Sequence, residues 1–530
     1  MRQVHESDVC IIGGGITSAM LCEKLAALRP GIRITVVEAG KTIFDFENRG
    51  RYRQRALDYG EHPWHEDYIE DQQAKGIISM TMALGGLALH WGAACNRFSV
   101  EDTRLRSMYG LAVDWPIEWA DLERCYVEAE QRLNVAGEPS PYAGDERSAP
   151  YPQPPVPLSW NLQVLKGWAE KSGLKFNPLP SAKQLTPGGG RGACCVFDTC
   201  GEVCPSGSRY SPDWTFKALL ANGQVVVHDR TLVRRLAVDP GQSRISVAQA
   251  RHQDRPEQEL EYRAPLFVVA SGYCWSSHLL LLSRSSRYPD GIANSSGLVG
   301  RYMNGHPFVN ATAVIDEQTF PGQYMSHSLI SREYFRCATD GPFVRHDTRV
   351  WESSAGREAR LRGEGGRLLL GDEVFDDWRG RISGSAVRLR AYLDMHPSAD
   401  SRLTLDPTSR NRYGDPLPTI QHHFDAETVA RQDRCRQHVL GVFEGFCKAG
   451  NGRIVGTSEG DYLDHPGGGC RMGDDPATSV VNSYGRTHDH ENLFVIGAPT
   501  TPTGGCTNGT LTFVALTLRS AEEIARSVRV

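Results

Sequence analysis

The sequence predicts an α/β fold that combines a domain built on a parallel sheet with either a second domain or one large insertion of helices and strands. Three observations support this fold class. A strand, glycine turn, helix and strand follow one another at 8–40, short buried strands return at 225–236 and 264–272, and 308–456 mixes strand-like runs with polar loops. The 530 residues are enough to bury a core in each of two domains.

The opening unit has clear boundaries. Val9 to Ile12 is rich in β-branched residues, Ile16 to Leu28 has apolar residues at helical spacing, and Ile34 to Val37 is a second short apolar run. Glycines separate the first strand from the helix, and an acidic residue follows the second strand. This order predicts a Rossmann-type βαβ unit.

The residues at the turns of this unit suit a dinucleotide. Gly13 allows the tight turn, and Gly15 lets backbone N–H groups and the positive end of the helix dipole approach a pyrophosphate. Glu38 is placed to accept hydrogen bonds from a ribose, and Ser18 is a small residue where a third glycine is usual. FAD and NAD both remain open at this point, and the alternative is an ordinary βαβ turn.

Composition excludes several classes of function. The formal charge is −5, with 58 basic and 63 acidic residues and no long charged run, which gives no electrostatic case for nucleic acid. The first strand leaves no room for a signal peptide, and the apolar runs are too short to span a bilayer. We therefore expect a cytoplasmic enzyme without a membrane segment, in which most of the 14 cysteines are buried thiols.

Connecting segments follow the opening unit. The stretch 41–75 is polar and predicts a loop with short helical pieces. The stretch 114–134 predicts an amphipathic helix packed on the nucleotide domain, with Asp121 as a candidate cap. The proline-rich stretch 139–157 predicts an extended surface connection.

A dense cysteine group follows near position 200. Cys194, Cys200 and Cys204 form a compact set of soft ligands suited to an iron–sulfur cluster or to zinc, and Cys195 could substitute for Cys194. Buried thiols or a disulfide are the alternative to a metal site.

Two further segments suggest contact with a planar ligand. Gly85 and Gly86 precede His90 and Trp91, and a glycine pair lets a backbone run flat against a ring system. Near the C-terminus, His465 lies in a predicted loop before a glycine-rich turn, a strand at 492–496 ends at Gly497 and Ala498, and Asn508 lies at the entry of a predicted helix.

These segments resemble the glucose-methanol-choline (GMC) family of FAD oxidoreductases. The likeness is strongest at 464–524, nearly end to end, and continues at 85–92 and 297–307, where we expect His306 to be structural. His90 and Trp91 resemble a pair in the pyranose oxidase branch. The cysteine segment resembles that of the large subunits of bacterial gluconate, fructose and FAD-dependent glucose dehydrogenases, which carry a three-iron cluster.

The resemblance implies a discontinuous Rossmann-type FAD-binding domain and an α+β substrate domain on an antiparallel sheet. The FAD-binding parts would be 1–110, 215–310 and 459–530, with the helix, proline-rich connection and cysteine segment at 111–214 and the substrate domain at 311–458. The implied cofactor-binding residues are Gly13, Gly15, Ser18, Glu38, Gly85, Gly86, His90, Trp91, Asn96, Val233, Ser271, Gly497 and Ala498.

The resemblance also implies a catalytic pair. His465 and Asn508 would face the flavin, with His465 as the general base while a hydride moves from a CH–OH carbon to flavin N5, and Asn508 orienting the hydroxyl. His90 is a candidate for covalent attachment of FAD, the alternative being a histidine that packs beside the ring. A cluster at the cysteines would pass electrons to an acceptor protein; without a cluster, oxygen could reoxidise the flavin.

The expected substrate is a sugar, an amino sugar such as an aminoglycoside, or a related polyol. Asp372, Glu373, Asp376 and Asp377 crowd beside Trp378 in a predicted loop, which could hold the ammonium groups of an amino sugar or be simply a solvated acidic loop. Two other classes stay open, a flavin-binding lyase and a redox sensor. Reduction of the flavin by a substrate would distinguish an oxidoreductase from both.

Overall fold

The structure is a computed structural model that describes 3–44, 46, 48–59, 75–76, 81–142, 144–145, 147–196, 200–201, 203–239, 241–319, 328–337, 341–352, 361–363, 366–382 and 385–528.

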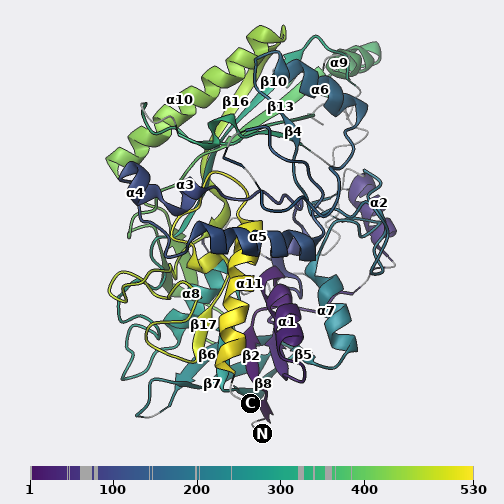
Figure 1. Cartoon of the computed structure of the whole chain (residues 1–530). Coiled ribbons are helices and arrows are strands. Elements are labelled where there is room, and N and C mark those ends of the chain that lie inside the picture. The colour runs from purple at the N-terminus through teal and green to yellow at the C-terminus, as the bar shows by residue number, and fades with distance from the viewer. Residues whose placement is uncertain are drawn as a thin grey trace.

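A five-stranded parallel sheet forms the centre of the lower layer (Figure 1). Its order is β17 (Leu493–Val495), β9 (Leu266–Val269), β2 (Val9–Ile12), β3 (Ile34–Val37) and β5 (Val225–His228). Strands β2, β3, β9 and β17 are buried throughout, as expected for a parallel sheet covered on both faces. The predicted strand, helix and strand of the opening unit are all present, with α1 at Ile16–Leu28.

Helices and a second sheet cover the parallel sheet. Helix α11 (Thr510–Ser527) lies beside α1, and α5 (Trp119–Leu133) crosses them (Figure 1). On the other side, the four-stranded sheet has the order β1 (Gln3–Glu6), β8 (Arg255–Arg263), β7 (Ile245–His252) and β6 (Thr231–Val238). Helix α8 (Gly272–Leu282) packs against β6 of this sheet, whereas α7 (Pro212–Ala221) lies beside α1.

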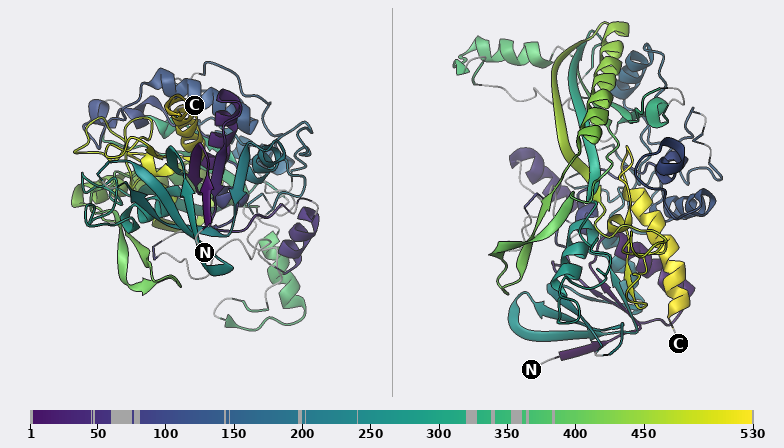
Figure 2. Two further views of the ribbon diagram at one scale, coloured as in Figure 1. Left: turned by 90° about the horizontal axis from the view of Figure 1, so that it is seen from below. Right: turned by 90° about the vertical axis from the view of Figure 1, so that its left-hand side faces the viewer.

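A six-stranded antiparallel sheet builds the upper layer. Its order is β16 (Arg453–Gly467), β10 (Asn304–Ile315), β13 (Ser385–Tyr392), β12 (Thr348–Glu352), β11 (Leu329–Ser331) and β4 (Asn177–Pro178). Helices α10 (Ala426–Ala449) and α6 (Trp160–Glu170) pack on one face of this sheet (Figure 2). The predicted fold class, an α/β nucleotide domain with an α+β domain on an antiparallel sheet, is confirmed.

Burial along β10 shows which face of this sheet packs against α10. Val309, Ala311 and Ala313 are buried in the core beneath α10, whereas Phe308, Asn310 and Thr312 on the opposite face are half-buried. This alternation is the period of a strand with one face in a core. The half-buried face therefore faces away from α10.

Shorter elements link the layers. They are α2 (Arg49–Tyr59), η1 (Gly86–Leu89), α3 (Val100–Thr103), α4 (Leu105–Tyr109), η2 (Glu333–Phe335), α9 (Asp372–Ile382), the two-stranded ribbon of β14 (Arg402–Arg410) and β15 (Pro416–Gln421), and η4 (Ala498–Thr500).

Four local predictions need correction. The N-cap of α5 is Glu118, and Asp121 instead forms ion pairs with Arg124 and Arg519. The strand predicted at 264–272 is shorter, since β9 ends at Val269 and helix α8 begins at Gly272.

The acidic residues from Asp372 to Asp377 belong to helix α9, where we predicted a loop. Asp372 and Glu373 lie in its first turn, where the helix dipole favours acids, and Glu373 also pairs with Arg367. His465 lies within β16, not in a loop.

The three segments assigned to FAD binding supply all five strands of the parallel sheet, while the domain boundaries stay predictions. β10 runs across the boundary at 310 and β16 across that at 458, because single strands lead from one layer into the other. None of the described helices is both long and apolar enough to cross a bilayer. The expected cytoplasmic location stays a prediction.

Candidate active site

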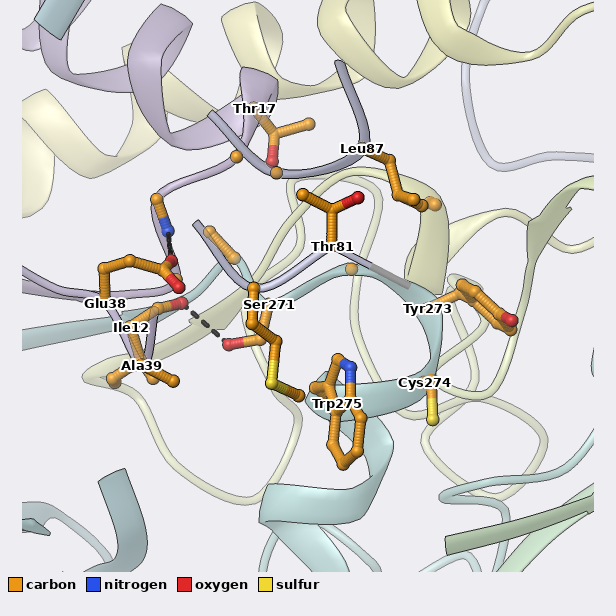
Figure 3. Close-up of a pocket in the computed structure, with 18 of the residues that line it drawn as sticks. Ile12, Thr17, Glu38, Ala39, Thr81, Leu87, Ser271, Tyr273, Cys274 and Trp275 are labelled. Atoms are coloured by element: carbon orange, nitrogen blue, oxygen red, sulfur yellow. Dashed lines mark hydrogen bonds between the residues drawn. The ribbon is translucent and has the colours of Figure 1, made fainter. Parts of the chain in front are cut away.

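A cavity of about 640 Å³ lies at the carboxyl ends of the parallel strands. It is lined by residues that directly follow β2, β3, β9 and β17, and by His465 of β16. Figure 3 shows the part of its wall that includes Glu38, Ser271 and Trp275. Crevices at this edge of a parallel sheet are the usual ligand sites of such folds.

The first turn of the nucleotide unit leaves room for a ligand. Gly13 has a φ of +98°, and a Cβ there would lie 2.7 Å from the carbonyl oxygen of Ala270, so this position needs glycine. A Cβ on Gly15, by contrast, would meet no atom within 4 Å. Gly15 is the N-cap of α1 and lines the cavity, so the open space lies at a helix N-terminus, where an anion is stabilised.

Glu38 closes the same end of the cavity (Figure 3). Its Oε2 accepts a hydrogen bond from Gly14 N at 2.6 Å and its Oε1 accepts one from Gly40 N at 2.8 Å. Burial raises the pKa of Glu38, and these backbone hydrogen bonds partly oppose the rise. Each carboxylate oxygen keeps a further lone pair for a ligand hydroxyl.

The cavity is also lined, besides the predicted Val233, by residues that the sequence did not indicate. Asn411 and Asp415 lie in the turn between β14 and β15, and Asp415 accepts two hydrogen bonds at 2.6 Å from Arg234. Trp275 of α8 lines the same region (Figure 3). No local pattern marks a ribbon turn as a cavity wall, since its position depends on long-range packing.

The glycine pair lies against the first turn. Gly85 N donates to Gly14 O at 2.8 Å, and a Cβ on Gly86 would lie 3.2 Å from the Cα of Gly15. His90 and Trp91 follow η1 and line the cavity, and the Trp91 indole donates to Tyr210 O at 2.8 Å. The structure therefore brings the two glycine segments together.

His465, which lines the cavity, is in contact with Asn508. Asn508 Nδ2 and His465 Nε2 are 2.6 Å apart. His465 has a φ of +52°, which is uncommon for a residue other than glycine, and the pairing of β16 with β10 is irregular around it. Such strain is concentrated at functional sites. Asn508 precedes Gly509, which is the N-cap of α11.

The surroundings of His465 favour a neutral imidazole. Burial lowers its pKa well below 6.5, and the nearby His306, Arg349 and Arg390 lower it further. His306 is buried, its Nδ1 donates to Gly505 O at 2.9 Å, and its ring centre is 5.4 Å from that of His465. His465 is thus held in the form that can accept a proton.

The other predicted cofactor residues are divided between the cavity wall and the packing behind it. Ser271 and Ala498 line the cavity, and Ser271 Oγ donates to Ile12 O at 2.9 Å (Figure 3). Ser18 is buried in α1, and a Cβ on Gly497 would lie 2.7 Å from Thr17 Cγ2.

Two neighbours in sequence have different roles. Asn96 donates to Asn508 Oδ1 at 3.2 Å, behind the pair. Arg97, by contrast, forms buried ion pairs with Glu123 and Glu130.

The four cysteines near position 200 do not assemble into a metal site. The part of the chain that the structure describes, which includes all four, contains no group of three or more His, Cys, Asp or Glu side chains placed to hold a metal ion. Burial alone would raise the pKa of Cys204, but hydrogen bonds from Ser208, Arg209 N and Ser206 and the Arg209 charge hold it below its usual value. The predicted ligand set is therefore not supported by the geometry.

The segment that follows these cysteines nevertheless packs on the cavity wall. Arg209 donates to Trp91 O at 2.8 Å and to Leu89 O at 2.6 Å. A Cβ on Gly201 would lie 3.8 Å from His90 O. The cysteine segment and the His90–Trp91 segment are thus direct neighbours.

The cavity fits FAD. The open space beside Gly15, the helix N-terminus and the Glu38 carboxylate suit the pyrophosphate and ribose, and the other wall carries a histidine in the form of a base. Fold and site together define an FAD-dependent oxidoreductase that acts on CH–OH groups.

Comparison with known proteins points to the same class. Residues 397–517 match the family model "GMC oxidoreductase". The chain is 28% identical to the fructose dehydrogenase large subunit of Gluconobacter japonicus, over 100% of this chain and 99% of that protein. It is 29% identical to 6'''-hydroxyparomomycin C oxidase of Streptomyces lividus, over 98% and 91% of the two chains. The C-terminal part of the chain thus matches the GMC oxidoreductase model, and the chain is similar along its whole length to oxidoreductases of sugars and aminoglycosides, in line with the resemblance that the sequence motifs suggested.

A solved structure supports the fold. Pyridoxine 4-oxidase from Mesorbium loti superimposes with a TM-score of 0.64 and 17% identity, over 98% of this chain and 99% of that chain.

Proposed function

We propose that this enzyme oxidises a CH–OH group of a sugar, an amino sugar or a related polyol, with His465 as the general base and Asn508 as its partner. The observation that carries the proposal is the 2.6 Å contact between Asn508 Nδ2 and His465 Nε2 at a cavity that suits FAD. Removal of a hydroxyl proton requires a base, here a neutral imidazole, and is helped by a nearby amide donor that stabilises the resulting negative charge.

Each residue has a distinct task. Bound FAD supplies the hydride acceptor that oxidation of an alcohol carbon needs. His465 Nε2 takes the hydroxyl proton once the substrate hydroxyl replaces the Asn508 amide at its lone pair, and its lowered pKa keeps Nε2 unprotonated at neutral pH. The Asn508 amide donates a hydrogen bond to the substrate oxygen as negative charge develops on it. Gly13, Gly15 and Glu38 would hold the pyrophosphate and ribose, and Gly85, Gly86 and Trp91 would line the ring system.

The relatives support the substrate class. By name, they include a fructose dehydrogenase and two oxidases of aminoglycosides, the second being paromamine 6'-oxidase of Streptomyces fradiae, 28% identical over 98% of this chain and 91% of that protein. The acids of α9 are not among the residues that line the cavity. Recognition of an amino sugar would therefore need groups other than Asp372 to Asp377.

Anaerobic bleaching of the flavin absorbance tests this proposal. Purified protein is mixed with ketoses, aldoses, polyols and amino sugars, and we expect at least one class to reduce the flavin. A lyase would turn over substrate without net reduction of the flavin, and the flavin of a redox sensor would be bleached by none of these compounds. Either result would overturn the proposed function.

The route by which electrons leave is a separate question. The sequence pattern of Cys194, Cys200 and Cys204, with Cys195 as substitute, favours a cluster and an acceptor protein, whereas the geometry gives it no support. Iron and acid-labile sulfide analysis of anaerobically purified protein decides the point. Flavin without iron and sulfide would remove the cluster and leave oxygen or another direct acceptor.

A further inference from the structure

A buried ion pair stands behind the catalytic asparagine. Arg349 and Asp347 lie at β12 and just before it, and both are buried, with 5% and 0% of their surface exposed. Arg349 donates to Asp347 Oδ2 through Nε at 2.9 Å and through Nη2 at 2.5 Å. Asp347 also accepts hydrogen bonds from Tyr392 N at 2.9 Å and from Thr507 Oγ1 at 3.1 Å. The guanidinium is therefore held rigidly.

The same guanidinium reaches the catalytic pair. Arg349 Nη2 contacts Asn508 Oδ1 at 2.5 Å, and Asn96 Nδ2 contacts the same atom at 3.2 Å. A guanidinium has only donors, so the atom of Asn508 that faces it must be the amide oxygen. The amide nitrogen must then face His465 Nε2, 2.6 Å away.

This orientation fixes the protonation of His465. Because the Asn508 amide nitrogen is a donor, Nε2 must present its lone pair to it, and the imidazole proton of the neutral ring resides on Nδ1. If the amide were rotated, its oxygen would face Nε2 and favour the tautomer that cannot act as a base there. The orientation of one amide thus decides whether the base is ready.

We propose that Arg349, anchored by Asp347, is a positioning residue that fixes the amide of Asn508 and through it the base-competent tautomer of His465. The inference rests on the proposed function, since it concerns the same pair. The described titratable or charged side chains around His465 are His306, Arg349, Arg390 and Tyr392, with Asp347 behind them. The side chain of the adjacent Asp464 lies outside the described residues.

Arg349→Lys is the first test variant. A lysine keeps a positive charge opposite Asp347 but offers a single ammonium in place of the planar fork, so it cannot hold Asp347 and Asn508 in the same way. We expect the rate constant of anaerobic flavin reduction to fall about tenfold to a hundredfold, the loss expected when a hydrogen bond from a charged group is removed. Arg388→Lys, at an exposed position on the neighbouring strand β13, is the matched control and should leave the rate unchanged.

A double-mutant cycle separates positioning from mere support of the fold. If Arg349 acts through Asn508, Arg349→Lys should change the rate less than about twofold in an Asn508→Ala background. A full additional loss in that background would overturn the inference. If the flavin is reduced at the native rate in both Asn508→Ala and His465→Ala, the proposed function fails instead. Failure of the inference and failure of the proposed function therefore give different results.

A second variant tests the charge without leaving Asp347 unpaired. Arg349→Met alone would bury an uncompensated carboxylate, so it is combined with Asp347→Asn. The pH dependence of carbethoxylation of His465, followed by peptide mass spectrometry, should show its inflection at a higher pH in this double variant and at the native pH in Arg349→Lys. An inflection that stays at the native pH in the double variant would contradict a role for this cation.

Discussion

Gly15→Ala is expected to separate FAD binding from folding. The backbone at Gly15 has φ −78° and ψ −171°, which any residue can adopt, and a Cβ there would meet no protein atom within 4 Å. The small N-cap preference for glycine over alanine and the gain in unfolded-state entropy nearly cancel, so the free energy of unfolding of the apoprotein should change by less than about 1 kcal/mol. The added methyl group instead occupies space assigned to the pyrophosphate.

The expected loss of affinity follows from the hydrogen bonds that would be displaced. A pyrophosphate at the N-terminus of α1 accepts charge-assisted bonds from backbone N–H groups, each contributing about 1.5–3 kcal/mol. Losing one or two of them should raise the Kd for FAD by at least about tenfold to a hundredfold. Titration of apoprotein with FAD, followed by flavin fluorescence, measures this change.

Gly13→Ala provides the contrast. Its positive φ and the 2.7 Å approach to Ala270 O mean that alanine strains the fold itself, so this variant should lose thermal stability even without FAD. Gly15→Ala with native FAD affinity, or with a stability loss like that of Gly13→Ala, would refute the assignment of the pyrophosphate to this turn.

Three further predictions follow from the site and its histidines. Since His465 is needed in its neutral form and its pKa lies well below 6.5, the flavin reduction rate should stay level as pH falls through 6.5 and decline only at lower pH; a decline centred at 6.5 or above, in stopped-flow measurements, would contradict this. If His90 attaches FAD covalently, acid-precipitated protein retains yellow flavin and His90→Ala loses it, whereas release of the flavin from both proteins indicates simple packing beside the ring. Burial lowers the pKa of His278 to about 4 and that of His346 to about 3, so the unfolded state binds more protons than the folded state below pH 6.5. Each of these two histidines should therefore reduce the free energy of unfolding by about 2 kcal/mol at pH 5 relative to pH 7. Denaturant titrations that give equal stability at the two pH values would contradict this.

Local patterns predicted the nucleotide unit to the residue. Strand β2, helix α1 and strand β3 have the predicted ends, because β-branched runs, glycine turns and helical spacing are properties of adjacent residues. The predicted antiparallel sheet is also present, although β4 joins it from a segment outside the predicted substrate domain.

Contacts between residues far apart in the sequence could not be predicted from local patterns. The contact of Arg349 with Asn508 joins β12 to the residues before α11, and no spacing in the sequence marks it. The positive φ of His465 depends on an irregular pairing between β10 and β16. His465 and Asn508 themselves were found through the resemblance to the family, while close spacing of cysteines did not by itself place their side chains around a metal.

The central claim is that His465 is the base that starts oxidation of the substrate. His465→Ala should bind FAD normally, yet its flavin should be reduced by substrate about a hundredfold to ten-thousandfold more slowly than in the native enzyme. His423→Ala, which removes an exposed histidine, should reduce at the native rate. Near-native anaerobic reduction of His465→Ala would contradict the account.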